Sequence, residues 1–214
     1  MNLVETLKTK YRSIDPIFDT DIYSLGYTDI DIEASLKENV FEEVKVDASL
    51  GVKCKVYTLV DYDDLFDLYT KVNSKDEQIV IKYYIGENYE YGYFTGFSSL
   101  NKIGYSNQIC GVYEIKSIKT NKKLEINIRN FKYIIDIVDK DLNSNKFKEY
   151  MYINAFNNFT KAFDISINTA INKMKDIKNL DLQFIMERIW LWYFYTQTKH
   201  DLWTLLIRQV HWVE

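Results

Sequence analysis

The sequence predicts an α+β fold, in which an N-terminal, mostly antiparallel β-sheet with short helices precedes an all-helical C-terminal part. Pro16 and all seven glycines lie at or before Gly111, and the remaining 103 residues contain neither, so turn signals are confined to the first half. Short alternating segments precede residue 138, and apolar residues at three-and-four spacing follow it. We therefore expect a β-rich domain at 1–138 and a helical region at 139–214 packed on it, an arrangement that one continuous domain would also satisfy.

The first 72 residues contain five expected elements. "MNLVETLKTKYR" is typical of a short helix, and "TDIDIE" (28–33) alternates Asp and Ile as a half-exposed strand would. The segments 40–46 and 52–60 are the next expected strands, and "DYDDLFDLYTKV" (61–72) has the apolar spacing of a helix.

Two hairpins are expected to complete the sheet. "QIVIKYYIGENYEYGYFTGF" (78–97) predicts the first, with its turn near Gly86. Residues 108–118 and 123–129 predict the second, and "FKYIIDIV" (131–138) is expected to extend the sheet.

The C-terminal part predicts a long amphipathic helix over about 145–178, followed by two aromatic-rich helices. The run 189–195 is apolar all round, which indicates a buried helix. Thr198 and Asp201 have capping-box spacing and are expected to open the last helix. Tryptophan and tyrosine are enriched at interface hot spots, so we expect the last helix also to contact another chain. The expected interface residues are Trp203, Arg208, His211 and Trp212.

Charge and hydropathy limit the classes of binding partner that we expect. The net charge is −4, with −8 in residues 1–70 and +4 in 71–214, and neither part has the clustered basic residues that phosphate binding needs. The apolar run 189–195 is too short to span a bilayer, and the N-terminus lacks the apolar core of a signal peptide. We expect no nucleic acid, no membrane, and a cytoplasmic location, in the host cell or in a virion for a viral protein.

Metal and cofactor chemistry is not expected. His200 and His211 would lie roughly 16 Å apart along one helix, too far to bind one zinc ion. No phosphate-binding glycine loop, dinucleotide-binding motif or nucleophile elbow occurs. Carboxylates at helix starts and on a solvated strand explain the acidic clusters, with weak divalent-cation binding as the alternative. These clusters are Asp15, Asp19 and Asp21; Asp29, Asp31 and Glu33; and Asp61, Asp63, Asp64 and Asp67.

The segment "YEIKS" (113–117) gives the alternative, enzymatic interpretation. Glu114 and Lys116 share one face of a strand and resemble the Glu-x-Lys half of the PD-(D/E)xK nuclease motif, which implies magnesium-dependent cleavage. The other interpretation is a solvated sheet face, where a turn at 120–121 would place Lys116 opposite Glu125.

Two features suggest a biological setting. The many Ile, Lys, Asn and Tyr residues indicate an AT-rich genome, as in a low-GC bacterium, a virus or a mobile element. "YGYFTGFSS" (91–99) resembles a strand of phage tail hub proteins, which implies a virion component. We expect a non-catalytic assembly protein, such as a connector, tail or baseplate subunit, that binds a protein partner or a second copy. The alternatives are the nuclease and a host-inhibiting or toxin-neutralising protein whose acidic first 70 residues meet a basic partner.

Overall fold

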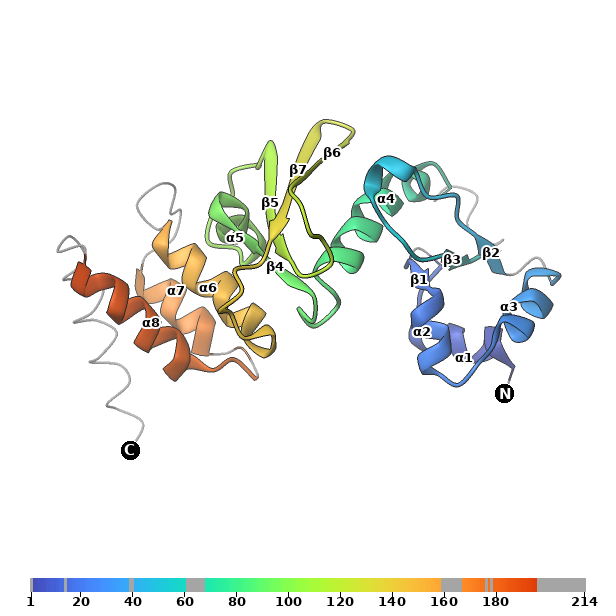
Figure 1. Cartoon of the computed structure of the whole chain (residues 1–214), viewed down its shortest axis with the longest axis horizontal. Coiled ribbons are helices and arrows are strands. Elements are labelled where there is room, and N and C mark those ends of the chain that lie inside the picture. Colours follow the sequence, from blue (N-terminus) through green and yellow to red (C-terminus); the bar gives the residue numbers. More distant parts are fainter. Residues whose placement is uncertain are drawn as a thin grey trace. The chain divides into compact units, whose positions relative to one another are not determined.

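The α+β class is confirmed in the computed structural model, whose elements are labelled in Figure 1. The chain divides into two compact units, Met1–Tyr83 (unit 1) and Tyr84–Glu214 (unit 2), rather than at 138/139. The structure describes residues 2–13, 15–38, 41–60, 68–158, 167–175, 177 and 179–195, and within these it leaves the side chains of 68–75, 167–168, 171 and 190–195 undescribed.

Unit 1 contains a three-stranded antiparallel sheet in the order β1-β3-β2. Tyr57 in the central strand lies opposite Ile17 of β1 and Glu43 of β2. The elements are α1 (Leu3–Lys10), β1 (Ile17–Phe18), α2 (Asp19–Ser24), α3 (Asp29–Leu36), β2 (Phe41–Glu43), the 3-10 helix η1 (Ala48–Leu50), β3 (Val56–Leu59) and α4 (Leu68–Tyr84), whose last residue opens unit 2.

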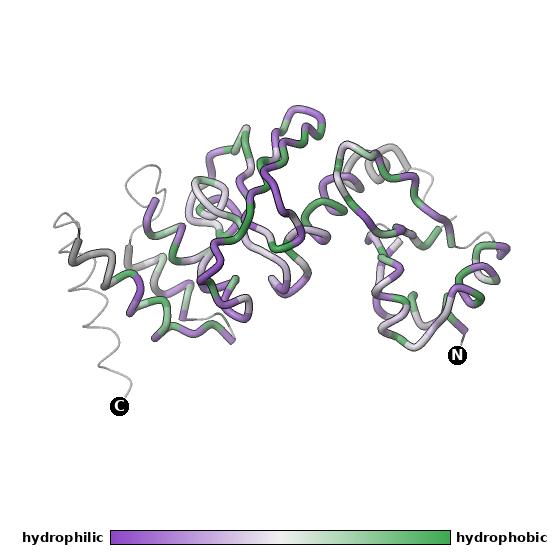
Figure 2. Tube along the Cα trace, viewed as in Figure 1, coloured by the Kyte–Doolittle hydropathy of each residue, from purple (hydrophilic) through white to green (hydrophobic). Residues whose placement is uncertain are grey.

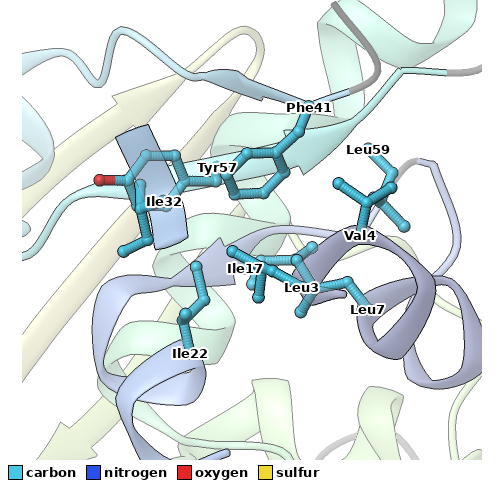
Figure 3. Packing of buried hydrophobic residues seen from close by; sticks show 9 residues of the cluster. All are labelled: Leu3, Val4, Leu7, Ile17, Ile22, Ile32, Phe41, Tyr57 and Leu59. Carbon is cyan, nitrogen blue, oxygen red and sulfur yellow. The ribbon is translucent and has the colours of Figure 1, made fainter. Parts of the chain in front are cut away.

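The expected first helix is confirmed as α1, and it begins at a capping box. The Asn2 side chain accepts the N–H of Glu5 at 2.8 Å, while Glu5 accepts the N–H of Asn2 at 3.2 Å. One face of α1 then packs into the core of unit 1 with the sheet (Figure 3). The core residues are Leu3, Val4, Leu7, Ile17, Ile22, Ile32, Phe41, Tyr57 and Leu59.

Two expected strands of unit 1 are helices instead. Residues 28–33 begin α3, because Asp31 accepts hydrogen bonds from the N–H and the hydroxyl of Thr28, each at 2.8 Å, and so closes a helical first turn. Acidic and apolar residues alternate along α3 (Figure 2), and the helix leaves Ile30 79% exposed. Residues 78–84 belong to α4, where Ile79, Val80, Tyr83 and Tyr84 are buried at helical spacing.

Lys82 of α4 lies in a cage of polar and aromatic groups. Its side chain is only 12% exposed, and Nζ lies 2.8 Å from Asp21 Oδ2. The ammonium also donates to the carbonyl oxygen of Pro16 at 2.9 Å. It lies 4.7 Å from the ring centroid of Tyr11 and 5.3 Å from that of Phe18, within cation–π range. These contacts hold α4 to the segment that leads into α2.

Unit 2 contains a four-stranded mixed sheet in the order β4-β5-β7-β6. β5 pairs antiparallel with β4 and parallel with β7, and β6 pairs antiparallel with β7. The elements are β4 (Gly92–Thr95), α5 (Gly96–Lys102), β5 (Val112–Ser117), β6 (Leu124–Ile128), β7 (Phe131–Ile137), the 3-10 helix η2 (Ser144–Lys146), α6 (Phe147–Asn157), α7 (Ile167–Lys175) and α8 (Leu182–Tyr195).

The expected strands 108–118 and 123–129 correspond to β5 and β6, but their pairing with each other is wrong. β7 lies between them, because β6 and β7 form a hairpin across only Arg129 and Asn130, with Arg129 at φ 55°. A two-residue connection is favoured over the longer 118–123 loop. "YGYFTGFSS" is also divided, since β4 ends at Thr95 and α5 begins at Gly96.

A backbone crossing fixes the start of this sheet. The Ser117 hydroxyl donates to the carbonyl oxygens of Tyr84 at 2.6 Å and Tyr91 at 3.1 Å. A Cβ at Gly92 would overlap the carbonyl oxygens of Lys116 and Tyr84. The end of α4 and two neighbouring strands therefore meet where only a hydrogen fits.

The expected 145–178 helix is described as two helices, α6 and α7. The side-chain amides of Asn154 and Asn158 donate to carbonyl oxygens four residues back, at 3.0 and 2.8 Å, and such bonds compete with helix continuation. α6 is not amphipathic, since eight of its eleven residues are buried. They are Phe147, Glu149, Tyr150, Met151, Tyr152, Ile153, Ala155 and Phe156.

The first of the two expected aromatic-rich helices is confirmed as α8. Asp181 caps it by accepting the N–H of Phe184 at 3.0 Å, and it pairs with Lys146 at 2.5 Å. The pKa of the Asp181 carboxyl is lowered, first by the hydrogen bond from Lys146 and then by that of the Phe184 amide. Within the predicted buried run 189–195, Ile189 is buried. The expected last helix lies outside the described residues.

Candidate functional site

Glu114 and Lys116 lie on one face of β5, as the nuclease interpretation requires. Lys116 does not meet Glu125, however. Its Nζ lies 3.4 Å from Asp136 Oδ2 and 3.7 Å from Asp139 Oδ1, while Glu125 pairs with Lys132 at 2.6 Å. That neighbour lowers the pKa of the Glu125 carboxyl. The lysine of the proposed motif is therefore held by two aspartates of the fold.

Glu114 is also engaged in the fold. Its N–H donates to the Ser98 hydroxyl at 2.7 Å, and its carboxylate lies over the start of α5, where a Cβ at Gly96 would overlap it. The strand positions beside Glu114 are Thr95 and Ile134, so neither neighbouring strand brings a second acid to it. Within the described ranges, no three His, Cys, Asp or Glu side chains are grouped as a metal site requires.

The expected interface residues Trp203, Arg208, His211 and Trp212 lie outside the described residues. The interface prediction therefore remains a prediction. A different candidate lies in unit 1, where acidic and tyrosine side chains from α2, α3, β2 and β3 converge. We call it the acidic tyrosine cluster: Asp19, Tyr23, Asp29, Glu43 and Tyr57.

The folding of unit 1 brings these residues together. Tyr57 and Glu43 are directly opposite each other in β3 and β2, so their side chains lie on the same face of the sheet. Asp19 is tied to the strand beside them, because Lys55 N–H donates to Asp19 Oδ2 at 3.3 Å. The Tyr23 hydroxyl donates to Asp29 Oδ1 at 2.6 Å, which links α2 to the first residue of α3.

The surrounding carboxylates affect the pKa values of both tyrosine hydroxyls. The hydrogen bond to Asp29 is the main cause that raises the pKa of Tyr23 to about 12, with burial and the charges of Asp29 and Asp19 adding to it. Burial is the main cause that raises the pKa of Tyr57 to about 12, and the charges of Glu43, Asp19 and Asp29 add to it. The charges of Asp19 and Asp29 thus add to the rise in pKa of both hydroxyls.

The carboxylates of this cluster have no cationic partner within the described ranges of the chain. Asp19, Asp29 and Glu43 form no ion pair with any residue of the described part of the chain. Asp21 contrasts with them, because it is neutralised by Lys82. Unit 1 as a whole carries 17 acidic and 10 basic side chains, a net charge of −7, whereas unit 2 carries 14 and 17, a net charge of +3.

Two apolar groups accompany these carboxylates at the surface. Tyr23 is 43% exposed, and Ile30, which follows Asp29 in α3, is 79% exposed. Sequence reasoning identified Asp19 and Asp29 only as members of separate acidic clusters and did not include the tyrosines. The Tyr57–Glu43 pairing depends on a strand register that local patterns do not specify.

No helix in the described ranges has both the length and the apolar character needed to cross a bilayer. Cys54 and Cys110 are not joined in a disulfide, and burial raises the pKa of the Cys110 thiol. Comparison of the chain with protein-family models, with curated proteins and with solved structures gave no match.

Proposed function

We propose that this protein acts without catalysis, by binding another protein through the acidic surface of unit 1. The observation that carries this proposal is the acidic tyrosine cluster, whose carboxylates have no cation within the described part of the chain. Unpaired surface carboxylates beside an exposed tyrosine and isoleucine favour a partner with a basic, partly apolar surface.

The Glu114–Lys116 pair gives weaker support to catalysis. Both residues contribute contacts that hold the sheet and α5 together, and Lys116 is already paired with Asp136. Such pairing stabilises a lysine within the fold, whereas a nuclease lysine must face the scissile phosphate. Non-catalytic binding therefore agrees better than catalysis with the contacts that Glu114 and Lys116 make.

Two biological settings fit this proposal. One is a virion component, consistent with an AT-rich coding bias, in which the partner is a neighbouring subunit or a second copy. The other is an inhibitor of a host protein or toxin, in which the acidic surface of unit 1 covers a basic site. Neighbouring virion genes would favour the first setting, and a neighbouring toxin gene the second.

The test is co-purification of the full-length chain from the cells that encode it, followed by association kinetics with the recovered protein. We expect the on-rate to fall steeply as salt rises, because steering is screened beyond about 8 Å at physiological ionic strength. Glu33→Lys on α3 should slow association, whereas the matched reversal Glu187→Lys on α8 should not; both residues are exposed.

Two results would count against the proposal. An on-rate that ignores both salt and Glu33→Lys would remove the acidic surface of unit 1 from binding. A chain that co-purifies with no protein and stays monomeric would remove protein binding as the function.

A further inference from the structure

The strand β6 forms one edge of the four-stranded sheet of unit 2 (Figure 1). Among the described strands only β7 pairs with it, since the strand order is β4-β5-β7-β6. An edge strand leaves a row of backbone N–H and C=O groups without a strand partner, and another chain can pair with them. The outward groups of β6 therefore decide what this edge can bind.

The turn between β6 and β7 determines which backbone groups point outward. Only two residues separate the strands, so Ile128 and Phe131 exchange hydrogen bonds at the end of the ladder. Such bonded pairs alternate along an antiparallel ladder, which leaves the N–H and C=O groups of Glu125 and Asn127 pointing away from β7. Both residues are exposed, and these outward groups form no hydrogen bond within the described part of the chain.

The strand itself carries no uncompensated charge. Glu125 is the one charged residue of β6, and its carboxylate lies 2.6 Å from the ammonium of Lys132 in β7. On the other face of the strand Ile126 and Ile128 are buried. The ladder with β7 is continuous from Leu124 to Ile128. The strand therefore lacks the proline, bulge or unpaired charge that commonly protects a sheet edge from another strand.

Three cations lie at the two ends of this edge. Lys122 and Lys123 precede β6, and Arg129 follows it. All three residues are exposed, and none of them forms an ion pair with a residue of the ranges that the structure describes. Both ends of the edge therefore favour negative charge on the segment that pairs with it.

We propose that β6 accepts an extended, acidic segment of another protein as an added strand of this sheet. The segment runs antiparallel to β6, because antiparallel pairing is slightly more stable per residue than parallel pairing. Its backbone bonds the outward groups of Glu125 and Asn127, and its acidic residues face Lys123 and Arg129 at the two ends. The inference goes beyond the acidic surface of unit 1 and does not depend on it.

A second copy of this chain fits the edge less well. Two β6 strands that pair over their full length, with Ile126 opposite Ile126, place Lys123 of each copy opposite Arg129 of the other. Like charges directly opposite each other in an antiparallel pair are destabilising. The cations at both ends thus favour an acidic segment over self-association.

The experiment titrates the 15N-labelled full-length chain with the capped peptide Asp-Val-Thr-Val-Thr-Val-Asp and follows backbone amide shifts. When its two Thr residues lie opposite Glu125 and Asn127, its terminal Asp residues lie opposite Lys123 and Arg129. We expect saturable shifts at the amides of Glu125 and Asn127. Replacing both Asp residues of the peptide with Lys should weaken binding at least about tenfold, because attraction at both ends becomes repulsion.

Methylation of peptide nitrogens distinguishes strand pairing from attraction between charges. Methyl groups on the two Thr nitrogens remove the donors that face β6. Methyl groups on the first two Val nitrogens lie on the opposite edge of the added strand and serve as the matched control. We expect the first modified peptide to give no saturable shifts and the second to bind like the unmodified peptide.

Variants of the chain test the same edge. Asn127→Pro removes an outward N–H and keeps the hydrogen bonds to β7, so the spectrum should retain the native dispersion. It should weaken peptide binding at least about tenfold, because a donor is lost and the ring lies in the path of the added strand. Lys123→Glu should weaken binding about fivefold. The matched reversal Lys140→Glu, at an exposed lysine of unit 2 outside β6, should leave the affinity unchanged.

Several results would overturn the inference. They are the absence of saturable shifts with the acidic peptide, equal binding of the acidic and basic peptides, equal binding of the two methylated peptides, or wild-type affinity in both Asn127→Pro and Lys123→Glu. A dimer of the full-length chain in light scattering that Asn127→Pro dissociates would assign the edge to a second copy instead.

Discussion

The Lys82→Met substitution should destabilise unit 1 by about 3 kcal/mol. Methionine keeps most of the apolar stem of lysine, so the change removes chiefly the ammonium and its contacts. The ammonium lies 2.8 Å from Asp21 Oδ2 and donates to Pro16 O at 2.9 Å. Among the residues that the structure describes, Asp21 would keep only the hydrogen bond from the Phe18 N–H, at 2.9 Å.

The expected magnitude follows from the burial of both partners. Breaking a fully buried ion pair by removing one partner costs about 3–5 kcal/mol. The Asp21 side chain is 26% exposed, which places the loss at the lower end of that range. The rings of Tyr11 and Phe18 add cation–π attraction of about 0.5–1 kcal/mol each, not additively.

Urea unfolding followed by two signals measures this loss. All four tryptophans lie within unit 2, so tryptophan emission reports that unit, while far-ultraviolet circular dichroism reports both. We expect Lys82→Met to shift the dichroism transition and to leave the emission transition in place. Equal shifts of both signals would show that the units unfold together, with the same total loss.

Two further variants control the measurement. Lys55→Met replaces an exposed lysine of the same unit and should change the stability by no more than about 0.5 kcal/mol. Asp21→Asn combined with Lys82→Met should give a coupling energy above about 1 kcal/mol, because the two residues are in contact. A Lys82→Met loss below about 1 kcal/mol, or no coupling, would refute the reasoning from burial.

Three other predictions follow from contacts of the fold. Lys116→Ala should lower the free energy of unfolding in urea by less than about 1 kcal/mol, because the ion pairs of Lys116 are partly exposed. Magnesium-dependent nuclease assays should show no cleavage by the wild type or by this variant. Cleavage that depends on Lys116 would restore the enzymatic interpretation. Ser98→Ala should cost about 1–3 kcal/mol and speed hydrogen exchange at the Glu114 amide, since Ser98 is fully buried and accepts that N–H; an unchanged exchange rate would contradict this. The pKa values of Tyr23 and Tyr57 are raised to about 12, so the stability that these two protonated hydroxyls contribute is present below pH 10 and is lost as the pH rises through 12. A tyrosinate absorbance titration of Tyr57→Phe should therefore lack one group that titrates near pH 12 in the wild type. Loss of a group near pH 10 instead would refute the assignment.

The sequence predicted α1, β5, β6, β7 and α8 at nearly their observed positions. In these segments the local pattern agrees with the burial that the fold imposes. "TDIDIE" is different, because the Thr28–Asp31 capping box overrides a period-two pattern and leaves Ile30 in solvent. "IVIKYY" is β-branched and aromatic, yet its buried positions follow the helical period. In both segments the sequence contains a helical signal, together with a stronger pattern that is typical of a strand.

The acidic tyrosine cluster could not be predicted in the same way. Its five residues come from four elements, and their proximity depends on the β2–β3 register and on the hydrogen bond between Tyr23 and Asp29. A position at the start of a helix is an adequate explanation for Asp19 and for Asp29 when each is taken alone. Only the folded unit shows that the charges of Asp19 and Asp29 act on the hydroxyl of Tyr57 as well as on that of Tyr23.

The backbone crossing at Gly92 has a consequence for tracing the ancestry of this chain. No side chain fits between the carbonyl oxygens of Lys116 and Tyr84, so selection should remove every substitution of Gly92. The hydroxyl at position 117 is constrained with it, since it ties the same strands to the end of α4. Surface residues of diverging sequences can change freely around this pair. A glycine followed 25 residues later by serine, within a strand–helix–strand segment, is therefore the mark by which distant relatives should be recognised.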